Sequence, residues 1–146
     1  MGTKVREVMT PRPHCATPDT PLSQVAEIMA RDEVGAVPLV LDDRLVGLVT
    51  DRDIVVRALA AGKDARGMPA REVASGDVVA VSPEHDLSEA LQLMARYKVR
   101  RLPVIEDGDR LVGIVAQADV ALEAKGKASG EMLEEISKPE QGPRLS

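Results

Sequence analysis

The chain contains an internal repeat, and this feature constrains its fold more than any other. Residues 5–53 align with residues 70–119 at a constant offset of 65, which becomes 66 after one inserted residue near Gly108. Matching segments include Arg6-Glu7-Val8 with Arg71-Glu72-Val73, Met29-Ala30-Arg31 with Met94-Ala95-Arg96, and Arg44-Leu45-Val46-Gly47 with Arg110-Leu111-Val112-Gly113. Two copies are too few for a solenoid array. A unit of roughly 55 residues is also marginal alone, because a domain of ~60 residues buries only about 60% of its unfolded surface. We therefore expect a closed pseudo-symmetric pair whose halves share one core.

Apolar residues at helical spacing predict one helix early in each unit. They are Leu22, Val25, Ala26 and Met29 in the first unit, and Leu87, Ala90, Leu91 and Met94 in the second. Thr20 followed by Pro21 predicts a helix start with proline at the first helical position. Asp86 with Glu89 predicts a capping box at the start of the second of these helices.

Each unit also contains a predicted β-hairpin. Its paired apolar runs are residues 36–41 and 45–49 in the first unit, and 102–106 and 111–115 in the second. Short strands are expected before the first helices, at residues 14–16 and 78–81, and second helices are expected to begin near Asp51 and Gln117. The predicted fold class is therefore α/β (α+β), with two pseudo-symmetric β-α-β-β-α repeats packed into one module.

The repeat divides the chain into four expected parts. They are repeat one at residues 4–60, a linker at residues 61–69, repeat two at residues 70–125, and a polar C-terminal tail at residues 126–146. In that tail, Ser129 could cap a short helix that runs through Ile136.

Composition excludes several classes of function. The aromatic content is 1%, and Tyr97 is the only aromatic residue, so binding of nucleic acid by base stacking is not expected. The net charge of −5 argues against binding of a phosphate backbone. One cysteine, Cys15, and two histidines provide neither a disulfide nor a metal-ligand set. The N-terminus lacks an apolar signal-peptide core and no run reaches ~20 apolar residues, so we expect a cytoplasmic protein without a membrane partner.

Two motifs recur in register. One is Gly47-Leu48-Val49-Thr50-Asp51-Arg52-Asp53, matched by Gly113-Ile114-Val115-Ala116-Gln117-Ala118-Asp119, and the other is Arg101-Leu102-Pro103-Val104 at the opening of a strand. Over about residues 4–125 the sequence resembles a tandem cystathionine-β-synthase (CBS) domain pair, or Bateman module, of the small stand-alone bacterial kind. The resemblance implies binding of an adenosine-containing ligand in clefts between the repeats. The expected ligands are AMP, ADP or ATP, S-adenosylmethionine or NAD. It also implies frequent homodimers and no required cofactor.

Thr50 and Asp53 are the first candidate ligand contacts. Thr50 lies where a strand ends and a helix begins, so its hydroxyl and the first N–H groups of that helix are expected to face an anion. Asp53 lies about one helical turn further on, and its carboxylate could accept hydrogen bonds from ribose hydroxyl groups. Both residue types also favour helix starts, so a purely structural capping role stays open. Gly47 and Gly113 would let a ligand or another segment approach the backbone closely, and packing is the simpler explanation for them.

Arg100 and Arg101 are the candidate phosphate ligands, because a guanidinium group can bind phosphate through two N–H donors. Adjacent strand residues point to opposite faces, and the resemblance favours Arg101. The alternative is a solvated strand edge. The resemblance also implies that each site takes its acidic residue from one repeat and its basic residue and adenine wall from the other. Site one then comprises Thr50, Asp53, Arg101, Arg100, Val78, Val79 and Leu48, with adenine held between aliphatic side chains.

The resemblance implies a second site that departs from the pattern. It would comprise Asp119, Ile114, Pro13, His14 and Ala36. Ala116 replaces the hydroxyl residue of the motif, and Gly35-Ala36 occupies the positions of Arg100-Arg101. We therefore expect this site to be weaker or to bind without phosphate.

The expected function is that of a sensor which changes conformation on binding an adenosine ligand and signals to an unidentified protein effector. The sequence shows no nucleophile–base set, so no enzymatic activity is expected. The alternative is a dimeric interaction scaffold with vestigial ligand clefts.

Overall fold

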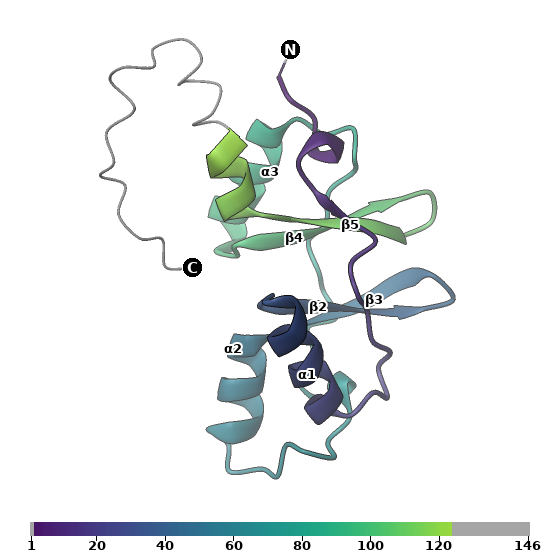
Figure 1. The fold of residues 1–146 in the computed structure, drawn as a ribbon, viewed down its shortest axis with the longest axis vertical. Helices are drawn as coiled ribbons and strands as arrows, with labels where there is room; N and C mark the ends of the chain where they lie inside the picture. The colour runs from purple at the N-terminus through teal and green to yellow at the C-terminus, as the bar shows by residue number, and fades with distance from the viewer. Residues whose placement is uncertain (1, 124–146) are drawn as a thin grey trace, which may run out of the picture.

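Two antiparallel β-hairpins form the centre of the molecule in the computed structural model, which describes residues 2–123 (Figure 1). The first pairs β2 (Ala36–Leu41) with β3 (Arg44–Thr50), and the second pairs β4 (Arg101–Glu106) with β5 (Arg110–Ala116). The hairpins meet at the pair Arg44 and Arg110, and the two-residue strand β1 (Thr10–Pro11) joins β5. The expected α+β fold with two pseudo-symmetric repeats is confirmed. The tail helix expected at residues 129–136 lies outside the described residues.

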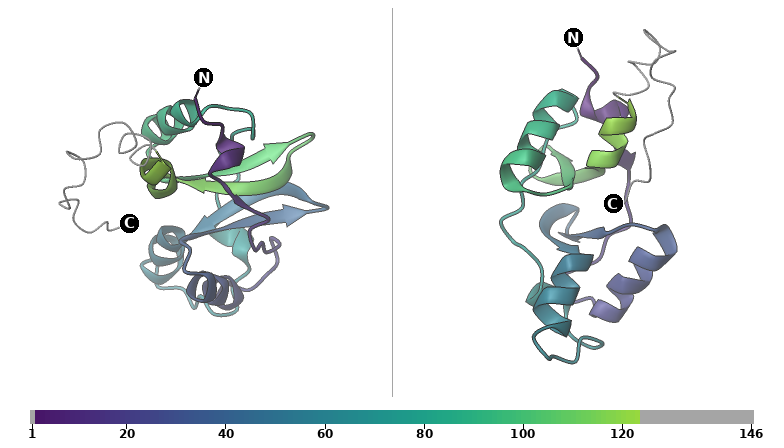
Figure 2. Two further views of the ribbon diagram at one scale, coloured as in Figure 1. Left: turned by 45° about the horizontal axis from the view of Figure 1, so that its top comes forward. Right: turned by 90° about the vertical axis from the view of Figure 1, so that its left-hand side faces the viewer.

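The helices lie beside the hairpins, one group for each repeat (Figure 2). Helix α1 (Leu22–Asp32) and helix α3 (Leu87–Tyr97) follow the predicted apolar spacing. Helix α2 (Asp51–Asp53) continues into the π-helical stretch η2 (Ile54–Leu59), and residues 117–123 are helical at the equivalent place. The second helices therefore begin at Asp51 and residue 117, as predicted.

The helix start at Thr20-Pro21 is wrong by one residue. Pro21 is the N-cap of α1 and Leu22 is the first helical residue. The Thr20 hydroxyl instead accepts a hydrogen bond from the Thr17 N–H at 2.9 Å, which closes the preceding turn. At α3 the prediction is confirmed, because the Asp86 N–H donates to the Glu89 carboxylate at 2.9 Å.

The short strands expected before α1 and α3 are reduced to single bridges. Ala16 pairs in parallel with Leu39, and Val81 pairs in parallel with Val104. Prolines follow closely in both segments, and a proline has no N–H to extend a ladder of hydrogen bonds.

Buried side chains form two clusters, so the expectation of a single shared core is wrong. Each cluster packs the hairpin and helices of one repeat together with the first segment of the other repeat. Val5 belongs to the repeat-two cluster, whereas Ala70 and Val73 belong to the repeat-one cluster, and all three are fully buried. The repeats are joined instead by a reciprocal exchange, in which the first segment of each repeat packs into the cluster of the other.

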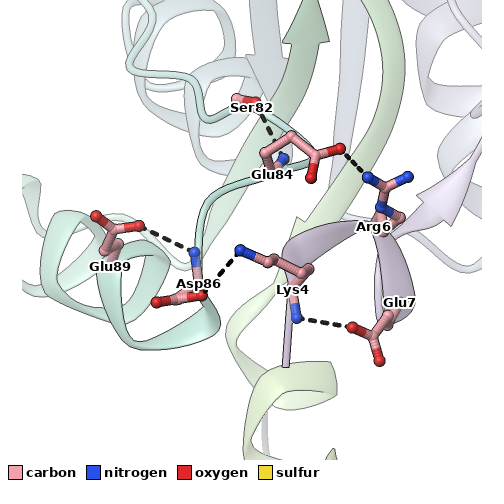
Figure 3. A network of polar contacts seen from close by, with 7 residues as sticks. All are labelled: Lys4, Arg6, Glu7, Ser82, Glu84, Asp86 and Glu89. Atoms are coloured by element: carbon pink, nitrogen blue, oxygen red, sulfur yellow. Dashed lines mark hydrogen bonds and ion pairs between the residues drawn. The ribbon is translucent and has the colours of Figure 1, made fainter. Parts of the chain in front are cut away.

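Equivalent hydrogen bonds hold the two exchanged segments, η1 (Val5–Glu7) and η3 (Ala70–Glu72). The Val5 N–H donates to His85 O and the Ala70 N–H donates to Thr20 O, both at 2.8 Å. Ion pairs follow the same symmetry, because Arg6 pairs with Glu84 and Arg71 pairs with Asp19. Figure 3 shows the Arg6–Glu84 pair together with the Lys4–Asp86 pair, whose atoms are 3.6 Å apart. The exchange therefore fixes how the repeats lie against each other.

Gly47 and Gly113 lie beneath the segments that cross between the repeats. Leu48 and Ser75 exchange two backbone hydrogen bonds, of 3.1 and 3.2 Å, beside Gly47. A Cβ atom at Gly113 would lie 2.9 Å from the Thr10 carbonyl oxygen, and one at Gly47 would lie 3.3 Å from the Ser75 carbonyl oxygen. Close packing of backbone therefore explains both glycines.

We predict that Val5→Ala destabilises the part of the protein to which Val5 packs rather than the repeat in which it lies. Loss of buried methyl groups should lower the free energy of unfolding by about 1–3 kcal/mol. Urea denaturation measures this loss, and hydrogen exchange should show reduced protection in α3 and β4. Val46→Ala is the matched control, because Val46 is 42% exposed and its truncation should cost less than about 0.5 kcal/mol. Equal losses for both variants, or reduced protection confined to α1, would contradict the exchange.

Candidate functional site

One cleft lies where the end of β3 in repeat one faces the start of β4 in repeat two. Its volume is about 360 Å³, which falls in the range of roughly 300–1,000 Å³ typical of small-molecule sites. Its lining residues are Leu48, Thr50, Asp51, Arg52, Asp53, Ser75, Asp77, Val78, Val79, Tyr97, Lys98, Val99, Arg100 and Arg101. The structure thus brings together all of the residues proposed for site one, and both repeats contribute to the cleft.

Thr50 and Asp53 form a reciprocal capping box at the start of α2. The Asp53 N–H donates to Thr50 Oγ1 at 3.0 Å, and the Thr50 N–H donates to Asp53 Oδ2 at 2.9 Å. Arg57 Nε lies 3.9 Å from Asp53 Oδ1 and its Nη1 donates to the Val73 carbonyl at 3.1 Å. Thr50 and Asp53 therefore do cap the helix, which is the structural role left open by the sequence. Each group keeps further capacity, because a hydroxyl can still donate and a carboxylate can accept several hydrogen bonds.

The first backbone N–H groups of α2 are not free to bind an anion, contrary to the expectation from the sequence. The Asp51 N–H donates to the Gly35 carbonyl at 3.0 Å. The Arg52 N–H donates to Asp51 Oδ1 at 2.8 Å, and the Asp53 N–H is held by Thr50. Side chains at the start of α2 and the backbone carbonyl just before β2 satisfy these donors. Side-chain donors, the cations among them, are therefore available to recognise an anion in this cleft, whereas these three N–H groups are not.

Four cationic side chains that line the cleft have no carboxylate partner in the described part of the chain. Within residues 2–123, Arg52, Lys98, Arg100 and Arg101 form no ion pair. Outside the cleft, Arg6, Arg71 and Arg110 are paired with carboxylates, whereas Arg12, Arg44 and Arg96 form no ion pair within the same residues, so what distinguishes the cleft is that four such cations gather in one concavity. The cleft also holds Asp51, Asp53 and Asp77. A small anion with hydroxyl groups would match this arrangement, because the cations and the hydrogen-bond acceptors are both available.

The analysis of the sequence missed Tyr97 as a cleft residue. The sequence predicted that adenine would lie between aliphatic side chains; Tyr97 lines the same cavity as Val78 and Val79 and adds an aromatic ring to that wall, and the position of adenine stays a prediction. Tyr97 is 48% exposed, and the Arg96 guanidinium carbon lies 5.6 Å from the centre of its ring. It is the last residue of α3, four residues before Arg101, so its proximity to the basic pair was the available signal.

None of the residues proposed for site two lines the cleft described above or a second cavity of the described residues. Ile114 lies on β5, opposite Thr10 and Pro103, and Asp119 lies in the helical stretch 117–123. Ala36 is buried on β2 and Pro13 is half-buried. The second cavity lies elsewhere, at residues 82–84 and 105–109.

His14, the remaining member of site two, contacts Asp32. Its Nδ1 pairs with Asp32 Oδ2, and this hydrogen bond is the main reason why the pKa of Asp32 is lowered. Arg31 Nε also lies 3.6 Å from Asp32. The His14 ring is therefore engaged with repeat one itself, and the second site stays a prediction.

The described residues offer no evident metal centre. Within residues 2–123, no group of three or more His, Cys, Asp or Glu side chains could hold a metal ion. Cys15 donates weakly to the Pro13 carbonyl, and burial raises the pKa of its thiol. No helix in this part of the chain is long and apolar enough to cross a membrane.

Two pseudo-symmetric β-α-β-β-α units with a polar cleft between them define the class of CBS domain pairs. The chain belongs to the CBS domain family, whose sequence model matches residues 5–59 and 70–126. It is 38% identical over 134 residues to the CBS domain-containing protein YhcV of Bacillus subtilis, which covers 91% of this chain and 94% of that protein. It is 37% identical over 138 residues to Hypoxic response protein 1 of Mycobacterium tuberculosis, which covers 94% and 96%.

Solved structures show the same fold. Hypoxic Response Protein I with two coordinated zinc ions has a TM-score of 0.75 and 40% identity, covering 82% of this chain and 98% of that one. The CBS domain pair of MJ0100 in complex with 5-methylthioadenosine and S-adenosyl-L-methionine has a TM-score of 0.79 and 25% identity, covering 87% and 99%. CBSX2 in complex with AMP has a TM-score of 0.75 and 26% identity, with the same coverage.

We predict opposite effects of exchanging the cap residues of the two motifs. Thr50→Ala should lower the free energy of unfolding by about 0.5–2 kcal/mol, because it removes a side-chain bond to the helix start. Ala116→Thr should raise it by about 1 kcal/mol, because it supplies the missing cap beside Asp119. Urea denaturation without ligand measures both effects, and Thr50→Ser is the control that keeps the hydroxyl. A neutral Thr50→Ala variant would show that the capping box contributes nothing to stability.

Proposed function

We propose that the protein is a regulatory module that binds an adenosine-containing ligand in the cleft between its repeats. The observation that carries this proposal is the set of four cations that form no ion pair among residues 2–123 and lie in the same cleft as the Thr50–Asp53 pair. Cations in a concave site are suited to a phosphate or another anion. The remaining hydrogen-bonding capacity of Thr50 and Asp53 is suited to ribose hydroxyl groups.

The cleft residues divide into three roles under this proposal. Arg101, with Arg100 beside it, binds phosphate. Asp53 and Thr50 bind the ribose. Tyr97, Val78 and Val79 enclose the adenine, whose flat apolar faces can pack against an aromatic ring and branched aliphatic side chains alike.

The ligand class is supported by structural relatives. MJ0100 and CBSX2 hold 5-methylthioadenosine with S-adenosyl-L-methionine and AMP, respectively, in the same fold. AMP, ADP, ATP, S-adenosylmethionine and NAD all share the adenosine part that the proposed contacts recognise. We therefore propose that the ligand is an adenosine-containing compound, with an adenine nucleotide as the leading candidate. We also propose that the protein requires no cofactor.

The proposed role is signalling rather than catalysis. Ligand binding between two repeats would change their relative angle, and a protein effector would respond to the change. The cytoplasmic location expected from the sequence stays part of this proposal.

We also propose that the chain forms a homodimer through an exposed apolar helix face. Val55, Val56 and Leu59 of η2 are 52%, 48% and 67% exposed, and Leu122 of the equivalent helix is 67% exposed. Figures 1 and 2 show η2 and the helical stretch 117–123 on the same side of the molecule. Related apolar side chains on pseudo-symmetric helices suit a two-fold contact between identical chains.

The ligand proposal predicts stabilisation by an adenosine compound. At 100 times its dissociation constant, a ligand should raise the free energy of unfolding by about 2.7 kcal/mol. Thermal denaturation with AMP, ADP, ATP, S-adenosylmethionine and NAD would measure it. Tyr97 gives a local readout, because it is the only aromatic residue and its fluorescence should change as the cleft fills. Guanosine monophosphate is the control for the base. No stabilisation by any compound at millimolar concentration would favour the scaffold alternative.

The dimer proposal predicts that Leu59→Glu produces monomers. A charge at the centre of an apolar contact would be buried without a partner, which opposes association. Sedimentation velocity would show the wild-type chain at twice the mass of the variant. Leu41→Glu is the matched control, because Leu41 is 51% exposed at the far end of the β2–β3 hairpin and should stay dimeric. A monomeric wild-type chain at micromolar concentration would overturn the proposal.

A further inference from the structure

Gly35 and Arg101 lie against each other across the boundary between the repeats. Gly35 directly precedes β2 of repeat one, and Arg101 opens β4 of repeat two. A Cβ atom at Gly35 would lie 2.6 Å from Nη2 and 2.9 Å from Cζ of Arg101. Both distances are far below ordinary contact between heavy atoms. The guanidinium group therefore occupies the space that any side chain at position 35 would need.

The backbone conformation does not explain this glycine. Within residues 2–123, the glycines with positive φ are Gly62 and Gly108, so position 35 has a conformation that other residues can adopt. Gly35 is buried, and its carbonyl accepts the Asp51 N–H at 3.0 Å. This bond places Gly35 directly beside the helix start that carries the Thr50–Asp53 pair. The close contact at Gly35 is therefore with Arg101, whose side chain lines the cleft at the proposed phosphate position.

An added methyl group at position 35 would push against the end of the flexible Arg101 side chain rather than against backbone. Asp51 Oδ2 lies 3.1 Å from the same Cβ position, on the repeat-one side. The flexible partner is Arg101, whose side chain forms no ion pair within residues 2–123. A side chain at position 35 would thus displace the guanidinium group and leave the rest of the cleft in place.

The contact also gives a reason for the inequality of the two repeats. Gly35-Ala36 aligns with Arg100-Arg101 in the internal repeat. Because Arg101 fills the space in front of position 35, an arginine at position 35 would compete with it for the same volume. The space for a basic residue at position 35 of repeat one is therefore taken by Arg101 of repeat two.

We propose that Gly35 is a specificity-determining residue, because its missing side chain lets Arg101 cross from repeat two to the phosphate position beside Thr50 and Asp53. This inference rests on the proposed function, since it assigns the phosphate selectivity of the same cleft. It makes the cleft selective for phosphorylated adenosine ligands over adenosine itself, and it does so through a residue that donates no hydrogen bond to the ligand.

Calorimetric titration of the full chain with AMP and with adenosine tests the proposal. Arg101→Ala should weaken AMP by about 10-fold or more and leave adenosine within about two-fold, because only AMP carries the phosphate. Gly35→Ala should reproduce this pattern, and Gly35→Ala combined with Arg101→Ala should bind AMP no more weakly than Arg101→Ala alone. Gly67→Ala is the matched control, because no atom lies within 4 Å of a Cβ at Gly67.

The outcomes separate this inference from the proposed function. A wild-type chain that binds neither compound would overturn the function itself. AMP binding that depends on Arg101 but is unchanged in Gly35→Ala would overturn only the role of Gly35. If Gly35→Ala does not fold, the contact still predicts that adding Arg101→Ala restores folding by making room for the methyl group. A double variant that stays unfolded would refute the contact.

Discussion

The reciprocal exchange of first segments is the constraint on which the rest of the structure depends. Val5 of repeat one is fully buried against repeat two, and Ala70 and Val73 of repeat two are fully buried against repeat one. Neither cluster of buried side chains is complete without the other half of the chain. The exchange therefore fixes the angle between the hairpins, and that angle brings the end of β3 to the start of β4. The cleft exists because of this closure, and the segment that follows η3 supplies one of its walls.

Thr50 and Asp53 have two roles in the cleft, one in the helix start and one in the cavity lining. Thr50 and Asp53 satisfy the helix start through their own hydrogen bonds, and they also present oxygen atoms to the cavity. A capping box stabilises the native state in the absence of ligand and holds both side chains in fixed rotamers. The cations behave differently, because Arg100, Arg101 and Lys98 have no carboxylate partner within the described residues. One half of the site is thus preorganised by local structure, and the other half is left with charge that an anion can neutralise.

Much of this arrangement could be predicted from the sequence, because the repeat supplied two copies of the helix and hairpin patterns. Apolar spacing predicted α1 and α3, and the motif that ends in Asp53 predicted the strand-to-helix junction of the site. The predictions that failed depend on how individual hydrogen-bond donors are satisfied and on which segments face each other. The N–H groups of α2 looked free because the Gly35 carbonyl that accepts one of them cannot be placed from local sequence. Tyr97 was overlooked because its position on the last turn of α3 becomes meaningful only when that turn faces β3.

The sequence by itself determined the elements, the two-fold arrangement of repeats and the residues that could bind a ligand, because periodicity, turns and motifs are local or repeat at a fixed offset. Only the tertiary structure decided that there are two buried clusters joined by exchanged segments. It also decided that a glycine in one repeat makes room for an arginine from the other. These features arise from contacts between residues far apart in the chain, 78 positions for Arg6 and Glu84 and 52 for Asp19 and Arg71, and two copies of one pattern do not reveal which copy packs against which.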